Sequence, residues 1–192
     1  MLVLLGAWRT RPVEYPGASL RALMRAMAGV PVVLTGRRCD VLAWNRLGHA
    51  LFAGHVDVEA PEQPRERPDI ARMIFTDAHT RSLYVDWRSK AKAVVEHLRL
   101  MAGRCPTDLL LVALVGELAV RSQDFTRLWA SHEVHACDTA TYELRHPSVG
   151  AVTVTQQSVT ATAAPDQFLA VATTEPGSSS EAALLLLAQL AE

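Results

Sequence analysis

The hydrophobic period of the chain changes within one short stretch, residues 35–52, and this change limits what the chain can fold into. Residues 39–44 alternate as in a β-strand, whereas the apolar residues that follow Asn45 recur at helical spacing. Asn45 is a good N-cap because its side chain is short and its amide oxygen can accept a hydrogen bond from a backbone N–H of the next turn. The stretch therefore predicts a strand that runs directly into a helix. Such a corner suits one wall of a pocket, and it also suits an ordinary junction with Trp44 in the core.

The rest of the chain is predicted to contain two groups of strands with helices between them. Strands are expected over residues 32–34, 39–44, 141–145, 149–159 and 168–173, and helices over residues 19–28, 46–52, 70–75, 84–104, 107–120, 122–129 and 181–190. The helix at 107–120 is expected to be buried because it is apolar on nearly every side, and residues 77–82 are expected to form a turn. This order predicts an α+β fold with a PAS-like five-stranded antiparallel sheet, covered by helices on one face.

Composition narrows the classes of function. With 19 basic and 20 acidic residues, the chain has no basic surplus for nucleic acid, so it is not expected to bind DNA by itself. Hydrophobic residues make up 49% and aromatic residues only 6%, so the core is mostly Ala, Leu and Val and could leave room for an apolar guest. Three widely spaced cysteines fit a reduced cytoplasmic setting. The longest apolar run, residues 109–115, is too short to span a membrane.

One segment, SHEVHAC at residues 131–137, invites a metal-site reading through His132, Glu133, His135 and Cys137. Its histidines are three apart, whereas HExxH places two histidines four apart on one helical face, and no second pair of ligands stands out. No metal and no other cofactor is therefore expected. The chain also lacks the motifs of nucleophilic catalysis and of phosphate binding, so it is not expected to be an enzyme.

Several separate blocks of the chain together resemble one family. They are CDVLAWN at residues 39–45, LYVDWRSKA at 83–91, VGELAVRSQDFTRLWASHEV at 115–134, RHPSVGAVTV at 145–154 and TTEPGSSSEAALLLLA at 173–188. In content and order these blocks resemble the ligand-binding domain of MmyB-like transcription regulators. One departure is Cys39, where the family usually carries Trp.

The resemblance implies a PAS-like ligand-binding domain over residues 18–192, with residues 1–17 as a linker or a remnant of a missing N-terminal DNA-binding domain. The implied function is that of the sensor domain of a bacterial transcription regulator. It would bind a small apolar ligand, a fatty acid, to control DNA binding by an Xre-type helix-turn-helix domain absent from this chain. The alternative is a ligand-free dimerisation or protein-interaction module with a packed core. For the helices at residues 19–28 and 184–190, a contact in a homodimer and a contact with the ligand are equally supported by the sequence.

If the domain is a sensor, the ligand is expected to lie between the sheet and the helices. The residues expected to line the pocket are Leu42, Trp44, Phe52, Phe75, Trp87, Leu114, Leu118, Phe125, Trp129, His146, Val152 and Val154. A carboxylate head group would need a polar partner at the mouth, for which Arg37, Arg38 and His146 are the candidates.

Overall fold

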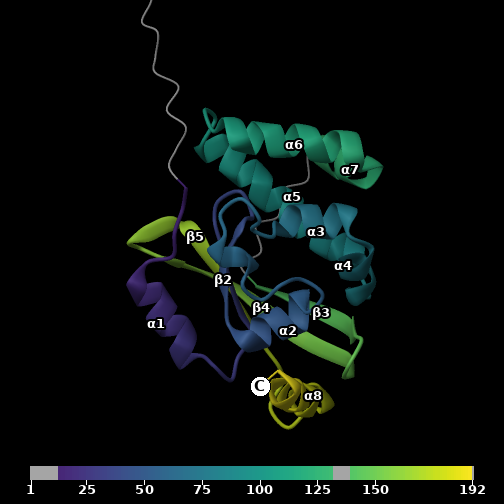
Figure 1. Cartoon of the computed structure of the whole chain (residues 1–192). Helices are drawn as coiled ribbons and strands as arrows, with labels where there is room; N and C mark the ends of the chain where they lie inside the picture. The colour runs from purple at the N-terminus through teal and green to yellow at the C-terminus, as the bar shows by residue number, and fades with distance from the viewer. Residues whose placement is uncertain (1–12, 132–138, 192) are drawn as a thin grey trace, which may run out of the picture.

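The computed structural model describes residues 13–131 and 139–191. Within these residues the fold is a five-stranded antiparallel sheet with helices packed around it, in the strand order β2-β1-β5-β4-β3 (Figure 1). The α+β class and the five-stranded antiparallel sheet predicted from the sequence are confirmed.

Two groups of strands that lie far apart in the sequence meet where β1 pairs with β5. The strands are β1 (Val32–Thr35), β2 (Val41–Trp44), β3 (Thr139–His146), β4 (Gly150–Ala161) and β5 (Ala164–Thr173). The helices are α1 (Ala18–Ala26), α2 (Arg46–Ala53), the short 3-10 helix η1 (Ala60–Glu62), α3 (Ile70–Thr76), α4 (Ala78–Leu83), α5 (Trp87–Arg104), α6 (Leu109–Arg121), α7 (Gln123–Ala130) and α8 (Ser179–Leu190).

Asn45 fixes the corner between β2 and α2, as predicted. Its Oδ1 accepts the N–H of Gly48 at 2.8 Å, which caps α2, and the N–H of Val32 at 3.0 Å. Its Nδ2 donates to the carbonyl oxygens of Met27 at 3.0 Å and Val30 at 2.6 Å. One amide therefore satisfies backbone groups of three segments, namely the turn after α1, strand β1 and helix α2.

Helix α2 packs directly on the backbone of β1, and Gly48 permits this close approach. A Cβ atom at residue 48 would lie 2.4 Å from the carbonyl oxygen of Val32 and 2.8 Å from its nitrogen. Because both atoms belong to the backbone of a paired strand, neither could move aside at low cost. The approach holds the following turn of α2, including Phe52, in the core beside the sheet.

Buried apolar side chains form two cores, one on each face of the sheet. The larger core lies between one face and the helices that follow β2, where Leu98 and Phe125 are fully buried. The smaller core lies under α1, whose Leu20 and Met24 pack against residues of β1, β2 and β5. The sequence predicted a sheet covered on one face. That prediction is wrong for strands β1, β2 and β5, because the apolar stripe of α1 covers their other face.

Three local predictions are also wrong. Residues 77–82 form most of α4 and not a turn, because Asp77 accepts the N–H of His79 at 2.7 Å and caps a helix there. Cys39 lies in the turn before β2, with a positive φ of 67°, and not in the strand. Helix α6 is buried along one stripe only, because it lies on the outer side of α3 and α5 (Figure 1).

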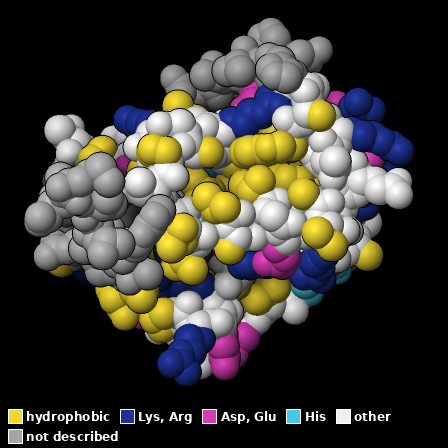
Figure 2. All heavy atoms as spheres, turned by 90° about the horizontal axis from the view of Figure 1, so that it is seen from above, with side chains coloured by type: hydrophobic (Ala, Val, Ile, Leu, Met, Phe, Trp, Pro, Cys, Tyr) yellow, Lys and Arg dark blue, Asp and Glu magenta, His cyan; other side chains and the backbone are white. Residues whose placement is uncertain are grey.

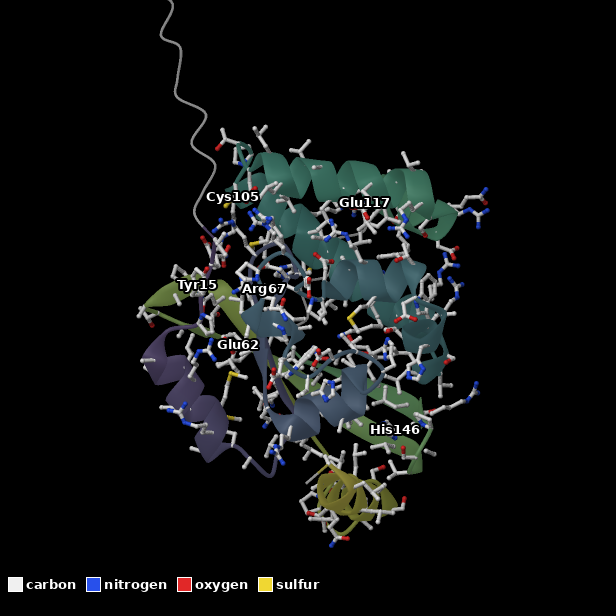
Figure 3. The ribbon with its side chains drawn as sticks, in the orientation of Figure 1. Tyr15, Glu62, Arg67, Cys105, Glu117 and His146 are labelled. Carbon is white, nitrogen blue, oxygen red and sulfur yellow. The ribbon has the colours of Figure 1, made fainter. Side chains whose placement is uncertain are left out.

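The outer surface of α6 is apolar. Figure 2 looks down on this helix and shows hydrophobic side chains gathered across the middle of the face. We call this surface the α6 band; it consists of Leu109, Leu110, Val112, Ala113, Ala119 and Val120, all exposed. The charged residue Glu117 lies beside the band (labelled in Figure 3) and accepts a hydrogen bond from Arg72 of α3 at 2.8 Å. The band itself therefore carries no charge.

Candidate functional site

A cavity of about 760 Å³ lies between α5 and the sheet. Its inner wall is made of buried side chains from separate elements, such as Val33 of β1, Phe52 of α2 and Ile74 of α3. Its outer end is bordered by exposed residues of α5, including Leu100 and Arg104. We call it the α5 cavity. Its volume and its largely apolar inner wall are typical of small-molecule binding sites.

The amino group of Lys90 lies in the wall of the α5 cavity. Lys90 is on the buried side of α5 and only 7% of the residue is exposed. Its Nζ donates to Oε1 of Gln156 on β4 at 2.9 Å. It also lies over the rings of Tyr142 and Tyr84, 4.8 and 5.7 Å from their centroids. No ion pair within the described part of the chain joins Lys90 to a carboxylate, so the cavity holds a cation with neutral partners only.

Burial controls the protonation of the groups in this wall. Loss of solvent lowers the pKa of Lys90 from 10.5 to about 8. Burial also raises the pKa of Cys39 and of Tyr84, and it lowers the pKa of His97 below its ordinary value. Cys39 and Tyr84 therefore stay protonated and His97 stays neutral near pH 8. Among these four groups, Lys90 is the one that changes its charge between pH 7 and pH 9.

The predicted partners of a carboxylate head group are engaged elsewhere. Arg37 is buried and donates through Nε to Oδ2 of Asp108 at 2.9 Å, and Nη1 of Arg38 lies 3.4 Å from the same oxygen. Asp108 is the N-cap of α6, and the pKa of its carboxyl is lowered because hydrogen bonds from Arg37 and the α6 backbone outweigh burial. At the other end of the molecule, Nε2 of His146 lies 2.9 Å from the carbonyl oxygen of Ala50.

The predicted aromatic residues of the pocket form a cluster of their own. The ring of Phe75 on α3 makes edge contacts with Trp87 at 5.8 Å and with Phe125 at 5.0 Å between centroids. Phe125 in turn stacks on Trp129 at 5.5 Å. The structure thus brings these four rings together, as expected for residues that share a wall, but against one another beside α5 and not around the α5 cavity.

The remaining predicted pocket residues lie in several places. Phe52 is in the wall of the α5 cavity. Leu42 belongs to the smaller core under α1, and the indole N–H of Trp44 donates to the carbonyl oxygen of Val58 at 2.8 Å. Four more lie in the larger core without lining the cavity: Leu114, Leu118, Val152 and Val154. Ligand contact by any of these residues stays a prediction.

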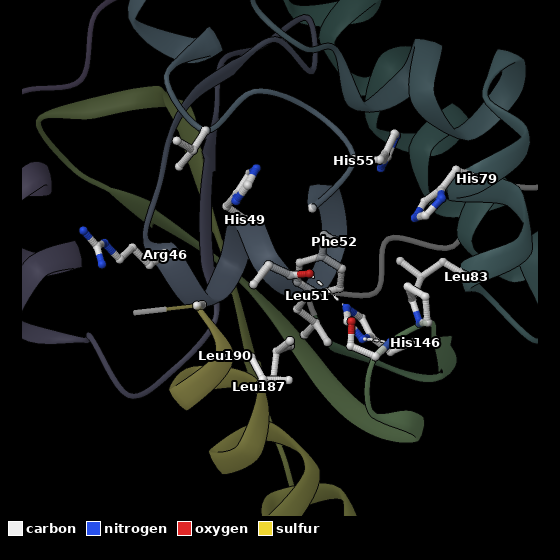
Figure 4. Close-up of a pocket in the computed structure, with 16 residues that line it drawn as sticks. Arg46, His49, Leu51, Phe52, His55, His79, Leu83, His146, Leu187 and Leu190 are labelled. Atoms are coloured by element: carbon white, nitrogen blue, oxygen red, sulfur yellow. Dashed lines mark hydrogen bonds between the residues drawn. The ribbon is translucent and has the colours of Figure 1, made fainter.

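A second pocket, of about 530 Å³, opens between α2, α4 and α8 (Figure 4). It is lined by several histidines, of which His55 and His79 stack at 4.1 Å between ring centroids. Nε2 of His49 lies 2.7 Å from the carbonyl oxygen of Val56, so this ring holds the turn after α2. Phe52 lies in the wall of both hollows and separates them. In this second pocket, which we call the histidine pocket, a smaller share of the lining is apolar than in the α5 cavity. We therefore regard the α5 cavity as the candidate site.

Sequence reasoning missed Lys90, although the sequence carries a signal for it. Trp87, Ala91 and Val94 recur at helical spacing in the α5 segment, and residue 90 falls on the same face, three residues after Trp87 and four before Val94. The chain contains only two lysines, Lys90 and Lys92, among its 19 basic residues. A lysine at core spacing in a chain that otherwise uses arginine indicates a buried amine.

The residues weighed as metal ligands, His132, Glu133, His135 and Cys137, lie outside the described residues. Of the helices that are described, none has both the length and the hydropathy needed to cross a bilayer.

Comparison with protein families identifies the family of this chain. Residues 17–187 match the family model described as the MmyB-like transcription regulator ligand binding domain. No curated protein matches the chain. The matched segment includes every element from α1 to β5 and most of α8, and it therefore includes the whole wall of the α5 cavity.

Proposed function

The chain belongs to the family of MmyB-like transcription regulator ligand binding domains, and on that basis we propose that it senses a fatty acid bound in the α5 cavity. The family supports a regulator sensor domain that takes a small-molecule ligand. A fatty acid fits the chemistry of this chain because it combines an apolar tail with one anionic group. We propose binding and not catalysis, and we place the protein in the cytoplasm.

The observation that carries the proposal is the buried amino group in an apolar wall. Lys90 has no carboxylate partner among the described residues, and a buried charge without a counter-charge is unfavourable. A ligand carboxylate would supply the missing charge and make a charge-assisted hydrogen bond to Nζ. The tail would then lie along the apolar wall that includes Val33, Phe52 and Ile74. This assignment replaces Arg37, Arg38 and His146 as the head-group partners.

Two measurements test the proposal. Lipid extracted from the purified protein and identified by mass spectrometry should contain fatty acid. Dodecanoic acid added at about a hundred times its Kd should stabilise the fold by about 2.7 kcal/mol, which raises the unfolding midpoint by roughly 5 to 10 °C. Dodecanol, which has the same tail without the charge, should stabilise less. A cavity that takes up neither compound would overturn the proposal.

A matched pair of variants separates the cavity from general surface charge. Lys90→Met keeps an unbranched side chain but removes the amine. It should weaken the binding of dodecanoic acid by about tenfold or more and leave the affinity for dodecanol nearly unchanged. Arg88→Met removes an exposed cation of the same helix that does not line the cavity. It should change neither affinity by more than about twofold, within the spread of ordinary surface changes.

We propose that ligand binding controls DNA binding by a helix-turn-helix domain of the Xre type. Two features support a PAS-like sensor: the strand order β2-β1-β5-β4-β3, and the helices inserted between β2 and β3. Ligand can act only through different affinities for two arrangements of the domain. In a regulator that carries both domains, dodecanoic acid should change the affinity for operator DNA, and Lys90→Met should remove that response while DNA binding persists. An unchanged operator affinity at saturating ligand would contradict control by this site.

The competing function is a dimerisation or interaction module, and the α6 band favours it. The sequence places a homodimer contact on α1 and α8. Leu20, Met24, Leu184 and Leu187 of those helices are buried in the two cores, while Leu185, Leu186 and Leu190 of α8 are exposed, and that contact stays a prediction. The α6 band is uncharged, so a second copy of the chain could lie against it without charge repulsion. We propose this face as the dimer contact.

Light scattering coupled to size exclusion tests the dimer. Val112→Glu places a charge in the α6 band and should shift the protein from dimer to monomer. Val159→Glu changes an exposed valine on β4, away from the band, and should leave the dimer intact. A wild-type protein that stays monomeric at high concentration would rule the contact out.

A further inference from the structure

The chain holds two lysines in very different surroundings. Lys90 is 7% exposed in the wall of the α5 cavity, whereas Lys92, two residues further along the same helix, also lines the cavity but is only half-buried. Around the amine of Lys90 lie one amide oxygen, from Gln156 at 2.9 Å, and the rings of Tyr84 and Tyr142. Among the described residues this amine, which carries three N–H groups when charged, makes one hydrogen bond, to Gln156. The surroundings therefore favour the neutral amine far more than water does.

The neutral amine has a free electron pair and is a nucleophile. With its pKa lowered to about 8 by burial, Lys90 is neutral in roughly one molecule in ten at pH 7, against about one in a few thousand for an ordinary lysine. The facing groups do not restore the proton. Burial raises the pKa of Cys39 and Tyr84, so neither becomes an anion near Lys90, and it lowers the pKa of His97, so that ring stays neutral.

We propose that Lys90 captures an apolar aldehyde in the α5 cavity as an imine. This inference rests on the proposed function, because it needs the cavity to accept an apolar chain. The nitrogen of the neutral amine attacks the carbonyl carbon, and the electron pair of the C=O bond moves to oxygen. A proton passes from nitrogen to that oxygen, and the resulting carbinolamine loses water to leave a C=N bond. One aldehyde is consumed and one water is released, with no oxidant or reductant.

The cavity suits each part of this reaction. Its apolar inner wall holds the chain and excludes water, which favours the imine over its hydrolysis. Gln156 bears an amide NH₂ beside the oxygen that accepts from Lys90, and this donor can serve the oxygen of the aldehyde. The outer end of the cavity, near Leu100 and Arg104, gives the released water a way out.

Reductive trapping tests the proposal on the folded protein. Dodecanal and sodium cyanoborohydride at pH 7.5 should add one group, with the mass of the aldehyde less one oxygen atom. Peptide mapping should place it on Lys90, with a rate about tenfold or more above that of Lys92. Dodecanoic acid should slow the labelling of Lys90, because it competes for the cavity, and leave that of the amino terminus unchanged. This competition needs no variant, so it stands even if a variant fails to fold.

Two variants complete the test. Lys90→Arg keeps a cation but forms no imine under these conditions, so the cavity adduct should disappear. Lys92→Arg should keep it. Equal labelling of Lys90, Lys92 and the amino terminus would overturn the proposal. Binding of dodecanoic acid without an adduct on Lys90 would overturn the imine and leave the proposed function standing. If dodecanoic acid does not bind and dodecanal forms no adduct on Lys90, both the imine and the proposed function are wrong.

Discussion

At the scale of single residues, the charge of Lys90 is the property on which ligand recognition depends. The amine is held by the amide of Gln156 and two tyrosine rings, and burial brings its pKa to about 8. A bound carboxylate stabilises the charged form and so raises that pKa again. Ligand binding and proton binding at Lys90 are therefore coupled.

This coupling predicts how affinity for a fatty acid depends on pH. Below about pH 8 Lys90 is charged before the ligand arrives, and the affinity should be constant. Above about pH 8 the free protein has lost the proton that the complex retains, so the affinity should fall by up to tenfold per pH unit. Titration calorimetry with dodecanoic acid between pH 7 and pH 10 measures the slope. Lys90→Met should bind more weakly with a flat profile, and Arg88→Met, at an exposed residue outside the cavity lining, should keep the wild-type slope.

Asp69 predicts a pH dependence of folding. It is buried as the N-cap of α3, where Oδ1 accepts the N–H of Arg72 at 2.9 Å, and burial outweighs this bond and raises its pKa to about 6. The native state then binds its proton more tightly than the unfolded chain does. Its contribution to stability is complete below about pH 4 and is lost as the pH rises through 6, by up to about 3 kcal/mol.

Replacing Asp69 by Asn should remove that loss while keeping a good N-cap. The variant should therefore be more stable than wild type at pH 7, and the difference should shrink toward pH 4. Urea unfolding at several pH values measures it. Asp86→Asn changes the exposed N-cap of α5 and provides the matched control. A pH profile of Asp69→Asn that parallels wild type would show that the buried carboxyl does not titrate in this range.

At this scale the sequence predicts local chemistry well and spatial partners poorly. The N-cap at Asn45 is predicted correctly because the cap and its target, Gly48, are three residues apart. The ion pair of Arg37 with Asp108 joins residues 71 positions apart, so nothing in the local pattern removes Arg37 as a head-group candidate. In the sequence, Asp108 lies near the start of a predicted helix, and nothing in the sequence connects it with Arg37.

At the scale of elements, hydrophobic period predicted nearly every helix and strand. The errors have physical causes. Residues 77–82 are too short and too polar to show a helical period, and the cap at Asp77 decides their conformation. For α6 the pattern is apolar all round, and only the position of the helix outside α3 and α5 determines which stripe is buried. The period of an element therefore predicts its type, while its neighbours determine its exposed face.

The contact between α2 and β1 predicts the effect of a single methyl group. Gly48→Ala would place Cβ 2.4 Å from the carbonyl oxygen of Val32, so the helix must move or the strand must bend. We expect a loss of about 1 to 3 kcal/mol, as for an overpacked core. Gly116→Ala in α6 has no heavy atom within 4 Å of its new Cβ and should gain about 0.5 to 1 kcal/mol.

Thermal or chemical unfolding of both glycine variants measures the difference. If Gly48→Ala is as stable as Gly116→Ala, α2 does not rest on the strand backbone as described. Loss of this contact would also displace Phe52, so Gly48→Ala should bind dodecanoic acid more weakly than its stability alone accounts for.

At the scale of the whole molecule, the α5 cavity is a product of packing and not of any one segment. Its wall takes residues from β1, α2, α3, α5 and the three C-terminal strands. The sequence supplied the correct general idea, a hollow between the sheet and the helices, from an Ala, Leu and Val core. It placed the aromatic residues around that hollow, whereas Phe75, Trp87, Phe125 and Trp129 pack on one another. Spacing alone does not distinguish a ring that faces a ligand from a ring that faces another ring.

The finite volume of the cavity predicts a limit on chain length. Each methylene buried from water contributes about 0.8 kcal/mol, so affinity should rise about fourfold per carbon along a series from octanoic acid upward. The rise should stop when the tail fills about 760 Å³. Ala170→Phe adds a ring to the cavity wall and should move the plateau to shorter chains. Affinity that climbs without a plateau in both proteins would indicate adsorption to a surface.

The position of Phe52 has a mechanical consequence. This ring divides the α5 cavity from the histidine pocket, and its helix is joined by the Asn45 amide to Val32 and to the turn that ends α1. Three segments held by one side chain cannot slide independently. If a ligand displaces Phe52 and α2 moves with it, we expect the hydrogen bonds of Asn45 to pass that movement to α1 and to the smaller core on the opposite face of the sheet.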